Sequence, residues 1–405
     1  MARRIVVVGG GVIGCSVAWH LARDGAGEVV LVERDRLGSG TTWHSAGNVV
    51  WNPGDERGPA ILYMLDEVVP AVTAESGLET GWLQTGRLYL ARTERALAGL
   101  AAKAEEGTSH GFVSRMLKPA ALRDHHPLIN PDAMVGAWLN GKVGRLNPAD
   151  LVAAYARAAR RRDVTILEER PVTGFATRGA TVCGVETAQG TIAADLVVIC
   201  GGLWSRRILE PLDVALGQWG CEHFYVIART DPVLARETPS FVSGEDCLYG
   251  REEVGGLLFG AFDSDAITLE DGAPPDDFSF SLLPENWDQF GPYAERATEL
   301  FPCLKSAPIH RFVNGPETFS PDGKPLVGPV EGIEGLLVAS AYNSGGVSYS
   351  GQAGQMVSDL VTGAEPRFDP AIYDPRRFGD RTRDVAWMRH TVSGSPSSRY
   401  KALHD

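Results

Sequence analysis

The segment that most constrains the fold of this chain is a short strand that runs directly into a glycine-rich turn and a helix. Residues 4–8 are nearly all apolar and β-branched, which is typical of a buried parallel strand. The following residues fit the spacing G-x-G-x-x-G at Gly9, Gly11 and Gly14, and residues 15–23 continue as a helix with one apolar face. A strand, a tight turn and a helix in this order predict part of a doubly wound α/β unit.

An acid at the end of the next strand indicates what this unit binds. Residues 29–32 form a second apolar strand that ends at Glu33, nineteen residues after Gly14. In such units the first glycine makes the turn, the second lets the backbone approach a pyrophosphate, and the third packs the helix on the strand. The carboxylate accepts the ribose hydroxyls and repels the extra phosphate of NADP, while the helix N-terminus attracts the pyrophosphate. A dinucleotide site is therefore predicted, the alternative being a glycine-rich turn in some other α/β protein.

Size, charge and cysteine usage narrow the class of protein further. A chain of 405 residues favours two domains or one large interrupted domain. The formal net charge of −13 disfavours nucleic acid and anionic membranes as partners. Six scattered cysteines without a C-x-x-C pair indicate buried thiols in a reducing cytoplasm. The first apolar run, residues 5–8, is too short for a signal peptide or a membrane span, so we expect neither.

The order of apolar runs predicts a mixed α/β fold in which a Rossmann-like nucleotide domain is interrupted by an antiparallel-sheet domain. Further strands are predicted at residues 195–202, 223–227, 256–260 and 336–340, and helices at 59–76, 147–161 and 286–301. A last helix is predicted to follow the turn at residues 343–346 and to run through Leu360. The predicted nucleotide domain comprises residues 1–85, 145–215 and 316–375, and the predicted substrate domain comprises 86–144 and 216–315. Residues 376–405 form a charged tail that we expect to be partly disordered.

Three stretches resemble the D-amino-acid-oxidase superfamily of flavoproteins, especially its dimethylglycine and sarcosine dehydrogenase branch. Residues 40–47, Gly-Thr-Thr-Trp-His-Ser-Ala-Gly, are close to that branch's G-S-T-W-H-A-A-G, and residues 222–226 resemble its Q-H-Q-Y-V. The third stretch combines Asn-Gly-Pro at 314–316 with Ser-Pro-Asp at 320–322 and Pro-Leu-Val-Gly-Pro at 325–329. The resemblance implies a p-hydroxybenzoate-hydroxylase-like fold that binds FAD and oxidises an N-methyl amine. Many members of the branch continue into a folate-binding domain, whereas this chain stops.

The resemblance also implies how the flavin is held. In the resembling enzymes the histidine of T-W-H is bonded to the flavin 8α-methyl group, which by position makes His44 the attachment site. A neutral imidazole is a competent nucleophile for that step; the alternative is a histidine that only forms hydrogen bonds in an ordered loop. The turn at Gly345 and Gly346 resembles the family element whose helix dipole stabilises negative charge on the reduced flavin; the alternative is an ordinary helix start.

The resemblance implies a catalytic role for two residues. His223 matches the active-site histidine of Q-H-Q-Y-V, and Tyr249 matches a tyrosine of the next hairpin. Hydride leaves the carbon beside nitrogen only when the nitrogen lone pair is free, so the ammonium must lose its proton. A nearby imidazole can take or relay that proton; the alternative is a strand histidine that only faces the core. The tyrosine is then available to orient the substrate carboxylate or the imidazole. Glu222 alternates to the opposite face of the predicted strand and is expected in solvent.

The complete prediction places FAD against residues of the glycine turn, the T-W-H loop and three later strand ends. These residues are Gly9, Gly11, Val12, Ile13, Gly14, Glu33, Arg34, Gly40, Thr41, Thr42, His44, Gly47, Val172, Gly201, Trp204, Gly315, Gly345, Gly346 and Val347. We expect a small amine as substrate and an electron-transfer protein or folate-dependent protein as possible partner. No metal-ligand spacing is present, and the pair His125–His126 before a proline is expected at the surface.

Two alternatives remain at this point. An NAD-dependent dehydrogenase also needs the glycine turn and Glu33, but needs neither His44 nor a nucleotide domain in three pieces. The other alternative is a flavin-holding subunit whose chemistry or electron acceptor lies on another polypeptide, a partnership that fits a chain without the folate-binding domain of the resembling enzymes.

Overall fold

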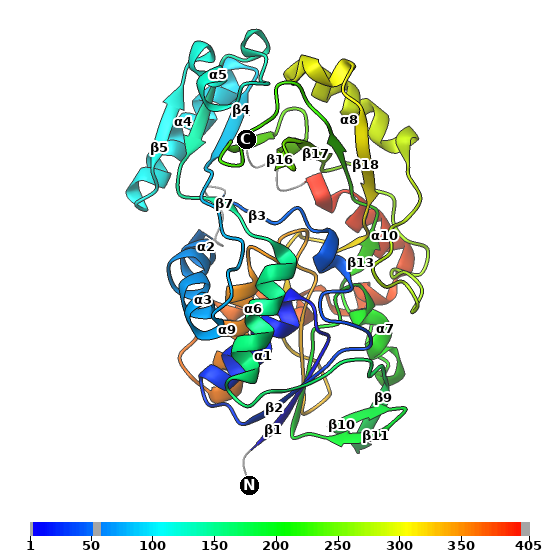
Figure 1. The fold of residues 1–405 in the computed structure, drawn as a ribbon. Coiled ribbons are helices and arrows are strands. Elements are labelled where there is room, and N and C mark those ends of the chain that lie inside the picture. The colour runs from blue at the N-terminus through cyan, green and yellow to red at the C-terminus, as the bar shows by residue number, and fades with distance from the viewer. Residues whose placement is uncertain (1–2, 52–57, 398–405) are drawn as a thin grey trace.

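The computed structural model describes residues 3–51 and 58–397, which are built around two large sheets that lie one above the other in Figure 1. The lower sheet has the strand order β20-β21-β12-β1-β2-β8, and all its neighbours are parallel except β20 and β21. Its strands are β1 (Arg4–Val8), β2 (Glu28–Val32), β8 (Thr165–Leu167), β12 (Leu196–Ile199), β20 (Leu326–Pro329) and β21 (Leu336–Ser340). The central strands are buried on both faces, as their apolar sequences predict.

Three helices cover one face of this sheet. Helix α1 (Val12–Arg23) packs between α6 (Pro148–Arg160) and α9 (Ser350–Thr362), as Figure 1 also shows. The start of α6 is fixed locally, because the Asn147 side chain accepts hydrogen bonds from the first free amides and Pro148 occupies the first helical position. These helices therefore place the glycine turn, which precedes α1, at the carboxyl edge of the sheet.

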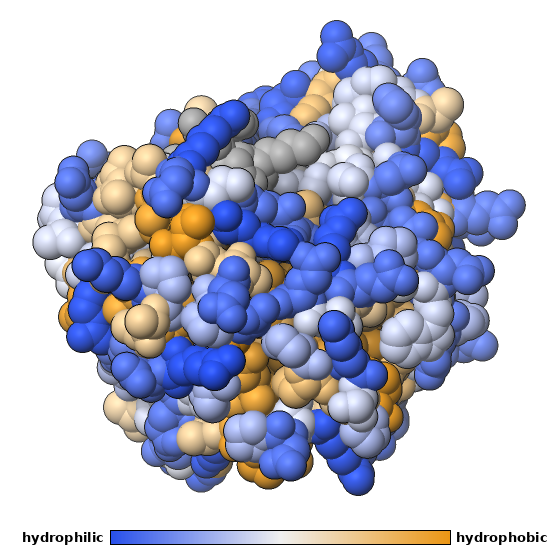
Figure 2. Space-filling model, turned by 90° about the horizontal axis from the view of Figure 1, so that it is seen from above, coloured by the Kyte–Doolittle hydropathy of each residue, from blue (hydrophilic) through white to orange (hydrophobic). Residues whose placement is uncertain are grey.

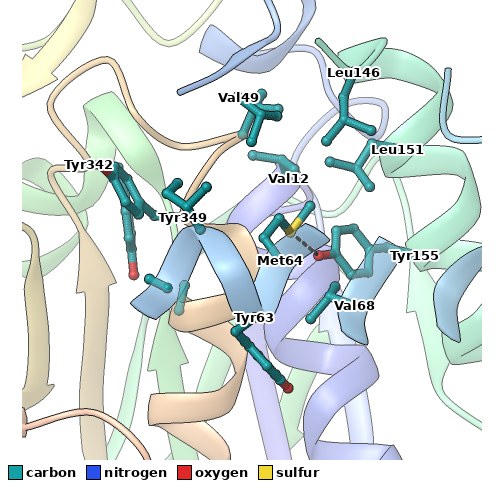
Figure 3. Packing of buried hydrophobic residues seen from close by; sticks show 14 of the residues in the cluster. Val12, Val49, Tyr63, Met64, Val68, Leu146, Leu151, Tyr155, Tyr342 and Tyr349 are labelled. Atoms are coloured by element: carbon teal, nitrogen blue, oxygen red, sulfur yellow. Dashed lines mark hydrogen bonds between the residues drawn. The ribbon is translucent and has the colours of Figure 1, made fainter. Parts of the chain in front are cut away.

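The side chains between these helices form the core that holds the turn in place. Figure 3 shows apolar residues converging from several elements, namely Val12, Val49, Tyr63, Met64, Val68, Leu146, Leu151, Tyr155, Tyr342 and Tyr349. The Tyr155 hydroxyl lies 3.8 Å from the Met64 sulfur. Each fully buried side chain of this kind contributes roughly 1.5–3 kcal/mol relative to exposure.

The upper sheet has the strand order β18-β14-β17-β16-β15-β4-β6-β5 and is antiparallel except for the parallel pair β15 and β4. Its strands are β4 (Arg87–Ala91), β5 (Ser114–Leu117), β6 (Gly136–Asn140), β14 (Phe224–Ala228), β15 (Ser240–Ser243), β16 (Leu248–Glu253), β17 (Gly256–Ala261) and β18 (Ile309–Asn314). Helix α8 (Trp287–Leu300) packs on β17. The two sheets confirm the predicted mixed α/β class; the domain boundaries stay a prediction.

Smaller elements connect these layers. The remaining strands are β3 (Asn48–Val49), β7 (Gly144–Arg145), β9 (Val172–Arg178), β10 (Thr181–Thr187), β11 (Gly190–Ala193), β13 (Trp219–Cys221) and β19 (Glu317–Phe319). The remaining α-helices are α2 (Gly58–Tyr63), α3 (Val69–Ser76), α4 (Glu94–Ser109), α5 (Leu122–His125), α7 (Ser205–Leu209) and α10 (Val385–Ser393). Among the described residues no helix has the length and apolar character needed to cross a membrane.

Several local predictions are corrected by the structure. The helix predicted over 59–76 contains a π-helical turn, Met64–Val68, between α2 and α3. Residue His223 precedes strand β14 instead of beginning it, and α9 begins at Ser350, a turn later than Gly346. His126 is buried, which contradicts its predicted surface position. It packs against Phe241 and Phe301, two residues that are distant from it in the sequence.

Residues 376–397 of the predicted tail include a packed helix. Helix α10 buries Met388 and Val392 in a cluster with Trp219 and Phe319, so apolar packing holds this segment. Residues 398–405 lie outside the described residues. Hydrophilic side chains dominate the face of the molecule in Figure 2, where they interrupt the smaller apolar groups.

Candidate active site

A cavity of about 650 Å³ lies at the carboxyl ends of β1, β2, β12 and β21, the position where open α/β sheets bind ligands. Its wall includes Val8, Val32, Cys200 and Ser340 from these strand ends. Most residues predicted to hold the cofactor line it, namely Gly9, Gly11, Val12, Ile13, Glu33, Arg34, Gly40, Thr41, Thr42, Val172, Gly201, Trp204, Gly346 and Val347.

The three glycines of the turn are required for different physical reasons. A Cβ on Gly9 would stand 2.4 Å from the Cys200 carbonyl oxygen, and one on Gly14 would stand 1.8 Å from the Gly9 carbonyl oxygen. Packing alone therefore requires these two glycines, and Gly14 supports the turn without lining the cavity. Gly11 has an ordinary φ of −71°, and its Cβ would meet nothing closer than the Thr42 hydroxyl at 3.3 Å. A side chain on Gly11 would instead enter the cavity, which fits a requirement set by a bound dinucleotide.

Glu33 is held in place by backbone amides. Its Oε2 accepts a hydrogen bond from the Gly10 amide at 2.6 Å, and its Oε1 accepts one from the Asp35 amide at 2.9 Å. Burial raises the pKa of the Glu33 carboxyl, and the two amide bonds oppose that rise. A carboxylate has lone pairs beyond these two bonds, so Glu33 can still accept ribose hydroxyls from the cavity it lines.

Arg34 and Trp204 form one side of the same cavity. The guanidinium carbon of Arg34 lies 3.7 Å from the centroid of the Trp204 ring, a cation–π contact. The Arg34 guanidinium also donates a hydrogen bond to the Phe278 carbonyl at 3.2 Å. The cavity wall near Glu33 thus includes a stacked guanidinium and indole, both of which are planar groups.

A second cavity of about 50 Å³ adjoins the first. Four residues line both cavities, namely Ser45, Glu317, Ser344 and Val347. His44, Gly47 and Gly345 line only the second, together with both predicted catalytic residues. The structure therefore brings the predicted attachment site and the predicted catalytic pair to one small cavity beside the dinucleotide cavity.

His223 and Tyr249 form the polar side of this small cavity. His223 Nε2 lies 3.1 Å from the Tyr249 hydroxyl, and the two rings are parallel within 1°. The Phe262 ring packs against both, with centroid distances of 4.9 Å to His223 and 4.8 Å to Tyr249. The imidazole is consequently buried, oriented by a hydroxyl and close enough to a cavity to exchange a proton.

His44 ends the short 3₁₀ turn Thr41–His44. Burial, with a smaller contribution from the neighbouring His223, lowers the pKa of its imidazole to about 3, so the ring is neutral above that pH. The Tyr225 hydroxyl donates to the His44 carbonyl at 3.0 Å. Thr42 accepts a hydrogen bond from the Val12 amide at 3.1 Å, which ties this turn to α1.

Gly315 lines neither cavity but links two of the site residues. Its amide donates a hydrogen bond of 2.9 Å to the His223 carbonyl, and the His44 ring occupies the space where a Cβ on Gly315 would stand. Gly315 is therefore a supporting residue and not a lining residue.

Two buried charged residues of the small cavity were missed by sequence reasoning. Arg87, the first residue of β4, is 2% exposed, and Glu317 in β19 is 6% exposed. The sequence did offer a signal for Arg87. It is a charged residue at the start of an otherwise apolar strand, on the same face as Tyr89. Glu222, in contrast, accepts hydrogen bonds from the side-chain amides of Asn286 and Asn314 and is only partly exposed, which corrects its expected solvation.

Comparison with known proteins gives the family. Residues 4–360 match the family model described as FAD dependent oxidoreductase. The chain is 32% identical to mitochondrial sarcosine dehydrogenase of Mus musculus over 99% of its length and 44% of the relative. It is 33% identical to mitochondrial dimethylglycine dehydrogenase of Rattus norvegicus, over 93% of the chain and 45% of that relative. The chain thus spans less than half the length of these curated relatives.

A solved structure shows the same fold. L-proline dehydrogenase from P. horikoshii superposes with a TM-score of 0.80, covering 93% of this chain and 97% of that one at 24% sequence identity.

Proposed function

The chain belongs to the FAD-dependent oxidoreductase family, and from this premise we propose that it oxidises an N-methyl amine, such as dimethylglycine or sarcosine. The family membership removes the NAD-dependent dehydrogenase alternative. The glycine turn and Glu33 support a site for the ADP half of FAD, and the neighbouring small cavity, lined by His223 and Tyr249, supports a site for the substrate. When bound, FAD supplies the acceptor for a hydride.

The hydrogen bond between His223 and Tyr249 in the small cavity carries this proposal. The substrate nitrogen must first lose its proton, and His223 is the group placed to receive it. A methyl C–H bond then breaks, its hydrogen leaves with both electrons, and the nitrogen lone pair forms the C=N bond of an iminium cation. Water adds to this cation and yields formaldehyde, the demethylated amine and a proton.

A covalent bond between His44 and FAD is part of the proposal. The neutral, buried imidazole supports it, because only an unprotonated ring nitrogen can attack an electron-poor methyl group. The ring lies in the small cavity that shares its wall with the dinucleotide cavity. A cytoplasmic location and an electron-transfer or folate-dependent partner stay predictions.

An anaerobic screen tests the proposed function. Purified yellow protein is mixed with sarcosine, dimethylglycine and longer N-methyl amino acids, and the flavin absorbance is followed. We expect bleaching with at least one of them. A flavin that stays oxidised with every one contradicts the proposal and favours the flavin-holding subunit.

A further inference from the structure

Arg87 is a buried cation that faces the small cavity. It is 2% exposed and shares this cavity with His223 and Tyr249. Its Nε has no hydrogen-bond partner among the described residues, and none of them forms an ion pair with it. Its guanidinium carbon lies 5.6 Å from the centroid of the Tyr89 ring, a cation–π contact.

Two partly buried arginines elsewhere in the structure have hydrogen-bond partners, which sets Arg87 apart. Arg145 forms an ion pair of 2.6 Å with Glu252, and Arg251 donates to the Ala46 carbonyl at 2.7 Å. Because a guanidinium stays protonated, an unpaired one in a buried position is strongly unfavourable unless an anion joins it. The position of Arg87 on a cavity wall gives such an anion access.

Glu317 is the opposite charge of the same cavity. It is 6% exposed, and its Oε2 has no hydrogen-bond partner among the described residues. Glu317 lines both cavities, so it lies at their junction, whereas Arg87 lines only the small one. The small cavity therefore carries an anion at the junction with the dinucleotide cavity and a cation away from that junction.

We propose that Arg87 binds the carboxylate of an amino-acid substrate and that Glu317 faces its nitrogen. Guanidinium and carboxylate form paired charge-assisted hydrogen bonds, which fix both position and direction. A carboxylate at the nitrogen end stabilises the ammonium that binds and the iminium that forms. The site then selects N-methyl amino acids over N-methyl amines without a carboxylate. This inference rests on the proposed function for the nature of the substrate.

The first experiment measures binding, independently of turnover. Methoxyacetate carries a carboxylate but no oxidisable amine, and 2-methoxyacetamide is its neutral counterpart. Their affinities for the flavin-loaded protein are measured by perturbation of the flavin spectrum. We expect Arg87→Gln to weaken methoxyacetate by about 10²-fold and 2-methoxyacetamide by less than about threefold, with Arg87→Lys intermediate. Arg115→Gln, at an exposed position of strand β5, is the matched control and should change neither affinity.

A second probe tests the nitrogen end. Glycine betaine carries a permanent cation and has no lone pair, so it cannot be oxidised. Glu317→Gln should weaken betaine by about tenfold and leave methoxyacetate unchanged, because methoxyacetate has no cationic end.

Two results would overturn the inference. One is unchanged methoxyacetate affinity in a folded, yellow Arg87→Gln protein; the other, which needs no variant, is equal affinity of the unmodified protein for methoxyacetate and 2-methoxyacetamide. Arg87-dependent methoxyacetate binding without bleaching by any N-methyl amine would support the anion site and reject the proposed function. Bleaching by an N-methyl amino acid that is unchanged in Arg87→Gln would support the proposed function and reject the anion site.

Discussion

Gly315 lies so close to His44 that a Cβ on Gly315 would stand 2.3 Å from the His44 Nδ1 atom. The same glycine donates its amide to the His223 carbonyl, so one backbone position supports both histidines of the site. Glycine is needed here for the close approach of a ring.

Gly315→Ala should therefore displace the His44 ring and prevent covalent flavin attachment. The overpacked methyl should also cost about 1–3 kcal/mol of folding free energy. The measurement is the yellow colour that stays with acid-precipitated protein, together with the mass of the tryptic peptide that contains His44. Gly291→Ala in α8, where nothing lies within 4 Å of the added Cβ, is the control and should keep its colour. Full covalent flavin in Gly315→Ala would show either that His44 is not the attachment site or that Gly315 does not hold its ring in position.

Gly11→Val should give a folded but colourless protein. The new side chain meets little protein and instead fills space in the dinucleotide cavity. Flavin content is measured from the absorbance spectrum, and folding from the circular dichroism spectrum. Gly14→Val should instead fail to fold, because its Cβ would overlap the Gly9 carbonyl oxygen. Retention of full flavin by Gly11→Val would contradict the assignment of the turn.

His223→Ala should slow anaerobic flavin reduction by ~10²–10⁴-fold, the usual contribution of a positioned acid or base. The pH–rate profile should move toward the alkaline pKa of the substrate itself, because only the neutral amine donates hydride. Tyr249→Phe should have a smaller effect, seen mainly in substrate binding. These rates are measured by stopped-flow absorbance across a pH series. An unchanged profile in His223→Ala would transfer the proton role to another group, with Tyr249 the first candidate.

Elements that a continuous run of residues encodes were predictable, whereas site residues that depend on contacts between distant segments were not. The strand, glycine turn and Glu33 are set by a continuous run of residues, and the structure places Gly9, Gly11 and Glu33 on one cavity. The place of Arg87 in the site was not predictable, because it depends on the pairing of β4 with β15, two strands that lie about 150 positions apart in the sequence.

Burial of His126 had the same cause. A histidine pair before a proline is polar by local pattern, but Phe241 and Phe301, which lie on elements distant in the sequence, pack against His126. The π-helical turn Met64–Val68 also escaped prediction, because helical periodicity does not distinguish one inserted residue.

The same histidine makes stability depend on pH. Burial lowers the pKa of His126 to about 4, below the ordinary 6.5, and neither ring nitrogen has a hydrogen-bond partner among the described residues. Between pH 6.5 and 4 the unfolded chain binds a proton at this position and the folded chain does not. The free energy of unfolding should therefore fall as the pH falls through this window, by about 1.4 kcal/mol per pH unit for this group.

His126→Phe should remove this part of the slope and raise stability at pH 5. The measurement is urea unfolding at a series of pH values, with His310→Phe on the exposed end of β18 as the control. His20 and His44, whose pKa values burial lowers to about 3, should keep part of the slope in every variant. A slope that is the same in His126→Phe and the unmodified protein would show that His126 is protonated equally in both states.

The central claim is oxidation of an N-methyl carbon, and one single-turnover experiment tests it most directly. Flavin-loaded protein is mixed without oxygen with dimethylglycine labelled with ¹³C in its methyl groups, and the carbonyl products are trapped and quantified. The account predicts that labelled formaldehyde forms in equal amount to the flavin that bleaches. Bleaching accompanied by glyoxylate in place of formaldehyde would place the broken C–H bond on the α-carbon and contradict the account.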